Sequence, residues 1–209
     1  VTNISHDLRT PLTAVCGYLE LLEREEKSAA AARYVGLIQN RAAALTGMTE
    51  ELFRYSLPLA DDVLEPQPVV LNRVLEESLL AQYGAFRARG LEPAVRLPQA
   101  PVCRRLDPGA LGRIFDNILS NALKCAEGDL AVTLLPDGTA EFTNTARGLT
   151  QTEVGRLFDR FYTVESGRGA TGLGLSIARL LAERMGGEIG AEYGGERLTV
   201  RVRFPETGA

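Results

Sequence analysis

The sequence has few histidines, lysines and cysteines and no long apolar run, and these absences exclude several classes of protein. Histidine occurs once, at His6, and only two of the 23 basic residues are lysines, Lys27 and Lys124. The three cysteines lie far apart without a C-x-x-C pair, which argues against a disulfide framework or zinc site and favours a reducing, cytosolic compartment. No apolar run approaches the roughly 18 residues of a membrane span, and no signal peptide is recognisable.

The overall composition is that of an ordinary globular protein. Apolar residues make up 45% and charged residues 24% of the 209 residues, which argues against intrinsic disorder. A net charge of −4 gives no reason to expect a nucleic-acid partner. The length predicts one or two domains, and the chain opens without Met inside a helical pattern, so we expect a fragment of a longer protein.

Residues 1–57 are predicted to form two helices. Ser28 can cap the second helix, and the first carries an apolar stripe at spacings of three and four, formed by Ile4, Leu8, Leu12, Val15, Leu19 and Leu22. In the second helix Ile38, Leu45 and Leu52 stand seven residues apart, which favours a helical hairpin that pairs with another copy. The alternative is a two-helix subdomain that packs on the rest of the chain.

The pattern changes after Pro58 and the acidic pair Asp61-Asp62, and residues 58–63 are predicted to be a linker. Helical periodicity runs over about 71–89, and a long helix follows Asp107-Pro108. Short or alternating apolar segments predict strands at 92–97, 101–106, 130–134 and 198–204. Helices mixed with mostly antiparallel strands predict an α+β sandwich over 64–209.

The first candidate site surrounds the single histidine. On a helix whose apolar stripe is centred on Ile4, His6 and Thr10 face solvent one turn apart. A neutral imidazole is a competent nucleophile near pH 7, and the neighbouring Asp7 can orient it or take its proton. The alternative is that these residues simply form a solvated surface.

The second candidate site is a polar row on the long helix. Asn117, Asn121 and Lys124 share one narrow sector, opposite the apolar residues of that helix. An amide oxygen can bind Mg²⁺, and a lysine supplies a mobile positive charge for phosphate. Asparagines are poor helix formers, yet the residues by themselves leave a solvated helix face equally open.

The third candidate site is the glycine-rich stretch 167–177, which leads directly into an apolar helix. Gly172 and Gly174 allow backbone amides to approach phosphate oxygens at the start of this helix. The stretch is not a P-loop, because no G-K-[ST] follows, and no strand precedes it as in a dinucleotide-binding fingerprint.

Taken in this order, the motifs resemble those of the catalytic core of a two-component sensor histidine kinase. Residues 5–12 resemble the H box of that family, 117–124 its N box, 157–162 its F box and 172–175 its second glycine box. The first glycine box, usually Asp-x-Gly-x-Gly, corresponds to Asn144-Thr145-Ala146-Arg147-Gly148. There Asn144 replaces the aspartate and Ala146 replaces a glycine.

The resemblance implies both the fold and the activity. It implies that 1–57 form a helical hairpin for dimerisation and phosphotransfer, and that 64–209 form a Bergerat-type (GHKL) α/β sandwich that binds ATP. The implied enzyme is an ATP-dependent protein-histidine kinase that autophosphorylates His6, passes the phosphoryl group to an aspartate of a response regulator, and also acts as a regulator phosphatase.

The resemblance also implies roles for individual residues. His6 would attack the γ-phosphate, Asp7 would assist it, and Thr10 would serve in dephosphorylating the regulator. Asn117 would hold Mg²⁺. The other implied nucleotide contacts are Asn121, Lys124, Asn144, Gly148, Arg160, Gly172, Leu173 and Gly174.

The implied partners are a response regulator and a second copy of the chain, with the parent protein anchored in a membrane upstream and this part in the cytoplasm. Two other functions remain open from the sequence. One is a nucleotide-sensing interaction module without transfer activity, which the altered first glycine box suggests. The other is a non-kinase ATPase of the same sandwich superfamily, against which the box around His6 argues.

Overall fold

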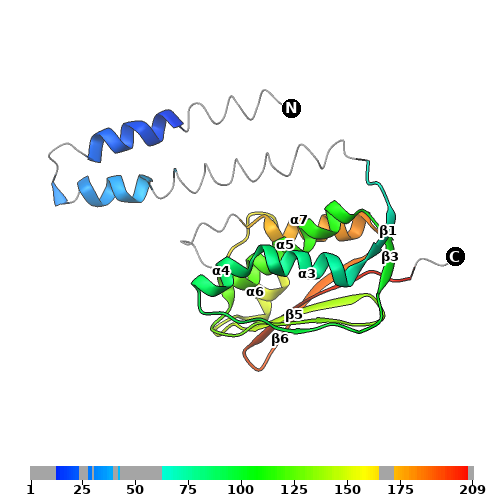
Figure 1. Ribbon diagram of the computed structural model, residues 1–209. Coiled ribbons are helices and arrows are strands. Elements are labelled where there is room, and N and C mark those ends of the chain that lie inside the picture. Colours follow the sequence, from blue (N-terminus) through cyan, green and yellow to red (C-terminus); the bar gives the residue numbers. More distant parts are fainter. Residues whose placement is uncertain are drawn as a thin grey trace. The chain divides into compact units, whose positions relative to one another are not determined.

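The computed structural model describes residues 13–23, 28–29, 31–39, 42, 63–164 and 172–206 (Figure 1). Contacts divide the chain into two units, Val1–Asp62 with Glu165–Leu173, and Val63–Val164 with Gly174–Ala209. Several sequence predictions lie outside the described residues: His6, Asp7, Thr10, Leu45, Leu52 and most of the linker at 58–63.

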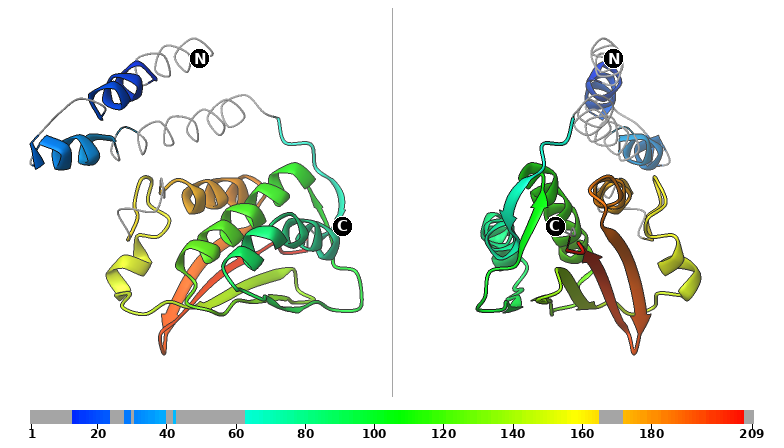
Figure 2. Two further views of the ribbon diagram at one scale, coloured as in Figure 1. Left: turned by 60° about the vertical axis from the view of Figure 1, so that its left-hand side comes forward. Right: turned by 90° about the vertical axis from the view of Figure 1, so that its right-hand side faces the viewer.

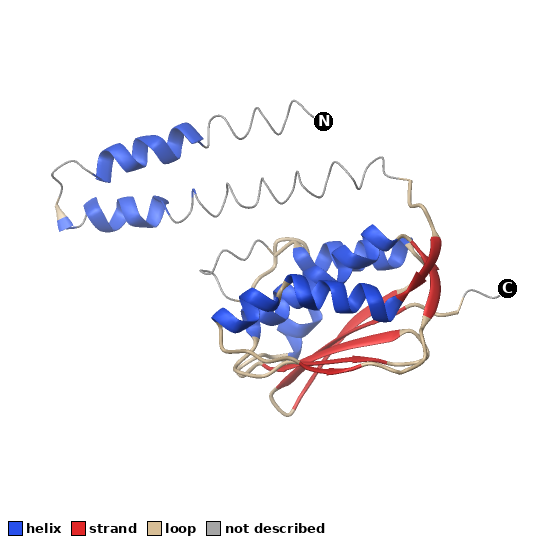
Figure 3. Cartoon of the chain, in the orientation of Figure 1, coloured by secondary structure: helices blue, strands red, loops and turns tan. Residues whose placement is uncertain are grey.

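In the first unit, residues 13–23 and 31–39 are helical (Figure 3). Their contact is a small apolar cluster formed by Leu19, Val35 and Ala42, against which Cys16 also packs. Gln39 Nε2 donates to Glu23 Oε2 at 3.0 Å and so links the two helices. The predicted helical hairpin is therefore present in this described part.

The start of the second helix is confirmed as predicted. Ser28 Oγ accepts the amide N–H of Ala31 at 3.2 Å, which is the hydrogen bond of an N-cap. Both helices nevertheless leave large apolar side chains exposed, namely Val15, Tyr18, Leu21, Leu22, Tyr34, Leu37 and Ile38. The hairpin thus buries little of its own apolar surface.

The second unit contains two sheets. Strands β1 (Gln67–Val70) and β3 (Cys103–Leu106) form an antiparallel pair. The larger sheet has the order β2-β4-β5-β7-β6, with β2 (Ala94–Arg96), β4 (Ala131–Leu134), β5 (Thr139–Thr145), β7 (Arg197–Arg203) and β6 (Glu188–Gly194). Strand β2 runs parallel to β4, and the other neighbours are antiparallel.

Helices cover one face of the larger sheet. The helices of this unit are α3 (Leu71–Ala81), α4 (Tyr83–Ala88), α5 (Pro108–Cys125), α6 (Gln151–Gly155) and α7 (Gly174–Arg184). Figure 2 shows α5 and α7 lying across the same side of the strands. No helix in the part of the chain that the structure describes is long and apolar enough to cross a membrane. The predicted sandwich is confirmed.

The helical pattern over 71–89 is not one continuous helix. The chain turns at Gln82, whose φ of −93° and ψ of −1° end α3 before α4 begins. Gln82 Nε2 lies 3.4 Å from the carbonyl oxygen of Asp116 on α5, and Phe86 beyond the turn is buried. The sequence periodicity missed this break because apolar positions continue through it.

The core lies between this helical layer and the sheet. Phe115 of α5 and Phe142 of β5 are fully buried, with ring centroids 6.0 Å apart. The buried face of α5 is the predicted apolar one and includes Leu111, Ile114, Phe115, Ile118, Leu119 and Ala122. Helix α5 is therefore held firmly in place, which fixes the direction of its remaining side chains.

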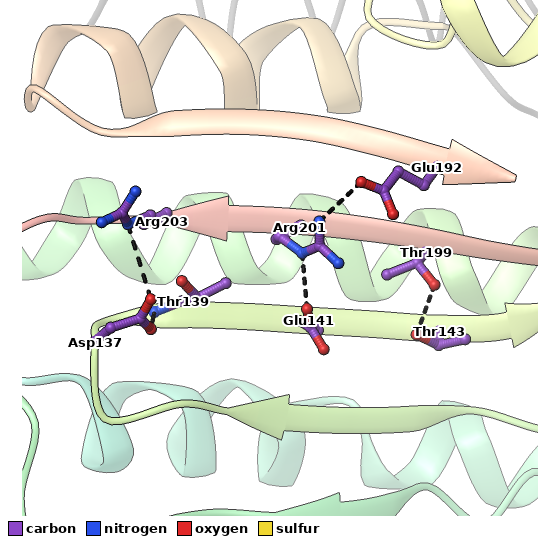
Figure 4. Close-up of polar contacts among 8 residues, drawn as sticks. All are labelled: Asp137, Thr139, Glu141, Thr143, Glu192, Thr199, Arg201 and Arg203. Atoms are coloured by element: carbon purple, nitrogen blue, oxygen red, sulfur yellow. Dashed lines mark hydrogen bonds and ion pairs between the residues drawn. The ribbon is translucent and has the colours of Figure 1, made fainter.

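The opposite face of the sheet is polar (Figure 4). The hydroxyls of Thr143 and Thr199 lie 2.9 Å apart, and Arg201 Nε donates to Glu141 at 2.7 Å. These pairs join β5 to β7 across the strands. The alternation predicted for 198–204 therefore separates a buried apolar face from a polar one.

Candidate nucleotide site

Helix α5 carries the predicted polar row, and its first turn sets the start of the helix. Asp107 caps it by accepting the N–H of Ala110 at 2.8 Å, and its second oxygen accepts the N–H of Glu65 at 3.0 Å. Burial opposes ionisation, but these backbone hydrogen bonds lower the pKa of Asp107 below its ordinary value. Pro108 follows at the first helical position, as expected.

Asn117 occupies the middle of α5 and is only 9% exposed. Its Nδ2 is buried and has no hydrogen-bond partner in the described structure. A buried, unpaired donor costs about 1–3 kcal/mol, so such groups persist where water or a ligand completes them. The alternative of a solvated helix face is therefore wrong for this residue.

Gly174, the first residue of α7, lies directly against Asn117. A Cβ atom at Gly174 would stand 3.3 Å from Asn117 Oδ1, tighter than ordinary van der Waals contact. The glycine-rich stretch and the polar row, 57 residues apart in sequence, thus meet at these two residues. Gly172 has a φ of +70°, which favours glycine, and Leu173 directly precedes α7.

Asn121 and Lys124 follow Asn117 on α5 and are half-buried. The last turn of α5, which carries Lys124, is held by the side chain of Arg89, which lies outside this helix. Arg89 Nη1 donates to the carbonyl oxygen of Leu123 and lies 3.5 Å from that of Lys124. A cation at a helix C-terminus satisfies carbonyls that the helix itself leaves open.

Asn144 stands near the end of β5 and is only 2% exposed. It alternates in step with Phe142, so its side chain faces the helical layer. Asn144 Nδ2 donates to the carbonyl oxygen of Thr145 at 3.0 Å. A carboxylate has no proton to donate, so an aspartate at this position would not form that bond.

The two glycine positions of the first glycine box differ in what the backbone requires. Gly148 has a φ of +77°, a conformation that side chains rarely adopt. Ala146 is buried and has no positive φ, so its backbone accepts alanine. The departure from the usual pattern at Ala146 therefore introduces no backbone strain.

The region resembling the F box lies just after α6. Phe161 has a φ of +64°, which costs a non-glycine residue of the order of 1–3 kcal/mol. The neighbouring Arg160 is exposed, and the guanidinium of Arg156 stacks 4.2 Å from the ring centroid of Tyr162. Strained residues such as Phe161 cluster at functional sites.

Five charged residues at and around the segment 145–147 were not expected from the sequence. They are Glu127, Asp129, Arg147, Glu196 and Arg197, which form ion pairs with one another. Burial raises the pKa of Asp129, but hydrogen bonds from Thr145 and Arg197 outweigh it and lower the pKa. The feature of the sequence that could have pointed to these contacts is the pair of acidic residues Glu127 and Asp129, shortly after the stretch 117–124.

Two family models match the chain. The model described as "His Kinase A (phospho-acceptor) domain" matches residues 1–58. The model described as "Histidine kinase-, DNA gyrase B-, and HSP90-like ATPase" matches residues 106–208. The first range includes His6, and the second includes every predicted nucleotide contact.

Curated relatives agree with these matches. The chain is 32% identical to the sensor histidine kinase YcbM of Bacillus subtilis, covering 92% of this chain and 66% of the relative. It is 33% identical to the sensor protein VanSC of Enterococcus gallinarum, covering 99% of this chain and 60% of the relative. The chain thus spans about two thirds or less of the length of these relatives.

Solved structures share the fold. Full-length ShkA in complex with AMPPNP is 25% identical, with a TM-score of 0.64 over all of this chain and 46% of ShkA. The histidine kinase AdeS of Acinetobacter baumannii is 18% identical, with a TM-score of 0.67 over 97% of this chain and 98% of AdeS. With both family models, these relatives and this fold in agreement, the chain belongs to the two-component sensor histidine kinases, a family of ATP-dependent protein-histidine kinases, and comprises a catalytic core of that family.

Proposed function

We propose that this chain binds ATP, phosphorylates its own His6 and passes the phosphoryl group to an aspartate of a response regulator. The observation that carries the proposal is Asn117, whose buried Nδ2 has no hydrogen-bond partner among the described residues and whose Oδ1 lies against Gly174. The phospho-acceptor model over 1–58 and the AMPPNP complex of the similar protein ShkA support it.

One group of residues would bind the base of the nucleotide and another would bind its phosphates. Asn144 Oδ1 would accept a hydrogen bond from the amino group of adenine, with the backbone of Gly148 beside it. Phosphate oxygens would meet Asn121, Lys124, Arg160 and the backbone of Gly172, Leu173 and Gly174. Helix α7 begins at Gly174 and would add the favourable field of a helix N-terminus.

Asn117 fits a magnesium ion, because an amide oxygen is a hard, neutral ligand of the kind Mg²⁺ accepts. No group of three or more His, Cys, Asp or Glu residues in the described ranges could hold a metal by itself. The ion would therefore be shared between Asn117 and phosphate oxygens, as is usual for Mg²⁺ in kinases. Its contribution would be to neutralise phosphate charge.

The chemical step would join a ring nitrogen of His6 to the γ-phosphorus. As this N–P bond forms, the bond from the γ-phosphorus to the β–γ bridging oxygen breaks and ADP leaves. Asp7 would take the imidazole proton. Since phosphoryl transfer needs little covalent help, the remaining residues act by positioning and charge neutralisation. The phosphohistidine would then pass its group to the regulator aspartate.

Further roles follow from the same proposal. Thr10 would orient water toward the regulator phospho-aspartate and so support phosphatase activity. The chain would form a homodimer through the hairpin of residues 1–57, whose exposed apolar side chains such as Ile38 need a partner. The parent protein would be anchored in a membrane upstream, with this core in the cytoplasm.

The direct test is incubation of the chain with Mg²⁺ and ATP labelled at the γ-phosphate. We expect an acid-labile, base-stable label in the unaltered chain, here called the parent, and none in a His6→Gln variant. Full labelling of the His6→Gln variant would overturn the assignment of His6. Nucleotide binding by the parent without any labelling would favour a nucleotide-sensing module instead.

A further inference from the structure

The segment proposed to bind adenine, residues 144–148, is held by two acidic residues from the connection between α5 and β4. Asp129 Oδ1 accepts the N–H of Thr145 at 2.7 Å. Glu127 Oε1 accepts the N–H of Arg147 at 2.8 Å, and the N–H of Glu127 donates to the carbonyl oxygen of Thr145 at 3.1 Å. Both the N–H and the carbonyl group of Thr145 are therefore fixed by hydrogen bonds.

A second layer of contacts holds these acidic residues in turn. Asp129 Oδ2 accepts from Arg197 Nη1 at 2.9 Å. The guanidinium of Arg147 lies between Glu127, at 3.6 Å, and Glu196, at 3.3 Å. The carbonyl oxygen of Glu196 also accepts the N–H of Ala146 at 2.9 Å. Three consecutive amides, at residues 145, 146 and 147, thus each have a defined acceptor.

This arrangement acts directly on the Asn144 side chain. The carbonyl oxygen of Thr145 accepts hydrogen bonds both from the backbone N–H of Glu127 and from Asn144 Nδ2, while Asp129 holds the N–H of the same residue. While that carbonyl stays in place, the amide of Asn144 keeps its nitrogen turned toward Thr145. Its Oδ1 then remains the free acceptor, which suits the amino group of adenine and repels the O6 of guanine.

We propose that Asp129 and Glu127 are positioning residues for base recognition, which keep Asn144 in the orientation that selects adenine over guanine. The inference rests on the proposed function, because it takes Asn144 as the residue that meets the base. Under this proposal an asparagine, which has both a donor and an acceptor, would replace an aspartate and still discriminate adenine from guanine.

The test compares Asp129→Ala with Asp129→Asn. Alanine removes the acceptor of the Thr145 N–H, which loosens residue 145 and with it the carbonyl oxygen that holds the Asn144 amide. We expect the preference for ATP over GTP to fall about tenfold, equivalent to roughly 1.4 kcal/mol. Asparagine retains an oxygen for Thr145, so Asp129→Asn should stay within about threefold of the parent preference, or roughly 0.7 kcal/mol.

A matched control lies at the other end of β5. Asp137 accepts the N–H of Thr139 at 3.0 Å and lies 3.9 Å from Arg203 (Figure 4), so it has the same kinds of partner as Asp129. Asp137→Ala should lower stability in the same way but leave the ATP-to-GTP ratio unchanged. The ratio does not depend on how much of a sample is correctly folded.

The measurement is competition of ATP and GTP against a fluorescent ATP analogue for the parent and the three variants. An unchanged ratio in Asp129→Ala, or an equal fall in Asp137→Ala, would overturn the inference while the proposed function stands. Failure of the parent to bind ATP would overturn the proposed function and this inference together.

Discussion

The two ends of the candidate site satisfy their hydrogen-bonding groups in opposite ways. At the end proposed for phosphate, Asn117 Nδ2 is buried and finds no hydrogen-bond partner in the part of the chain that the structure describes. At the end proposed for the base, the amides of Thr145, Ala146 and Arg147 are all bonded before any ligand arrives. The base end is therefore preorganised, whereas the phosphate end retains a donor that a ligand or water can complete.

The largest expected effect comes from removing the unsatisfied group. In Asn117→Leu an apolar side chain with the same branching and number of heavy atoms replaces the buried amide, so the free energy of unfolding should stay within about 1 kcal/mol of the unaltered chain or rise. Phosphorylation should fall by at least about a hundredfold, or roughly 2.7 kcal/mol. The two readouts are thermal unfolding and the rate of label incorporation.

Asn72 provides the matched control for this change. Its Nδ2 donates to the carbonyl oxygen of Pro98 at 3.0 Å, and its Oδ1 accepts the N–H of Val102 at 2.9 Å. Asn72→Ala should cost about 1–3 kcal/mol of stability and leave the phosphorylation rate of the folded protein unchanged. If the phosphorylation rate fell equally in Asn72→Ala and in Asn117→Leu, Asn117 would have no special role in phosphorylation.

The second effect comes from crowding the phosphate end. Gly174→Ala places a Cβ 3.3 Å from Asn117 Oδ1, so the amide must shift by a few tenths of an ångström. We expect the KM for ATP to rise about tenfold, or roughly 1.4 kcal/mol. The control is Gly155→Ala in α6, where a Cβ meets no atom of the described residues within 4 Å, and its KM should equal that of the unaltered chain. A Gly174→Ala enzyme with parental KM would show that the contact is dispensable.

The third effect is the loss of folding stability at low pH. The pKa values of Asp129 and Asp107 are lowered from 3.8, so their stabilising contribution is complete above that value and disappears as the pH falls through the folded pKa. The free energy of unfolding should therefore decline below about pH 4, and less steeply in Asp129→Asn. Denaturant titrations at several pH values measure this. Equal slopes for variant and parent would contradict a contribution from Asp129.

The smallest effect comes from restoring the usual glycine at the base end, at residue 146. Because Ala146 has no positive φ, glycine gains nothing in the folded state and increases the freedom of the unfolded chain. Ala146→Gly should lower stability by about 0.5–1 kcal/mol without improving the affinity for ATP. An increase in affinity would mean that the alanine does obstruct the nucleotide.

The elements predicted well were those with strong periodicity. The apolar face of α5 and the alternation of β7 are visible in the sequence because each buries one face along its length. Strand β6 was missed because both of its faces are largely exposed or half-buried, so it carries little alternation. Helix α6 does have a sequence signal, a capping box from Thr150 to Glu153.

The candidate site was only partly predictable for a different reason. Asn117 and Gly174 stand in recognisable motifs, so their meeting could be expected from the family resemblance. The role of Asp129 could not, since its partners are a backbone N–H at Thr145 and an arginine 68 residues away. Backbone amides carry no sequence signature, and contacts between distant residues leave none in a single sequence.

The most direct measurement of the central claim is peptide mass spectrometry after incubation with ATP and Mg²⁺, under conditions that preserve phosphohistidine. We predict one added phosphate on the peptide that contains His6, and at most about a hundredth of that amount on the same peptide in Asn117→Leu. Phosphate on any other peptide, or on the His6 peptide of Asn117→Leu at the parental level, would contradict it.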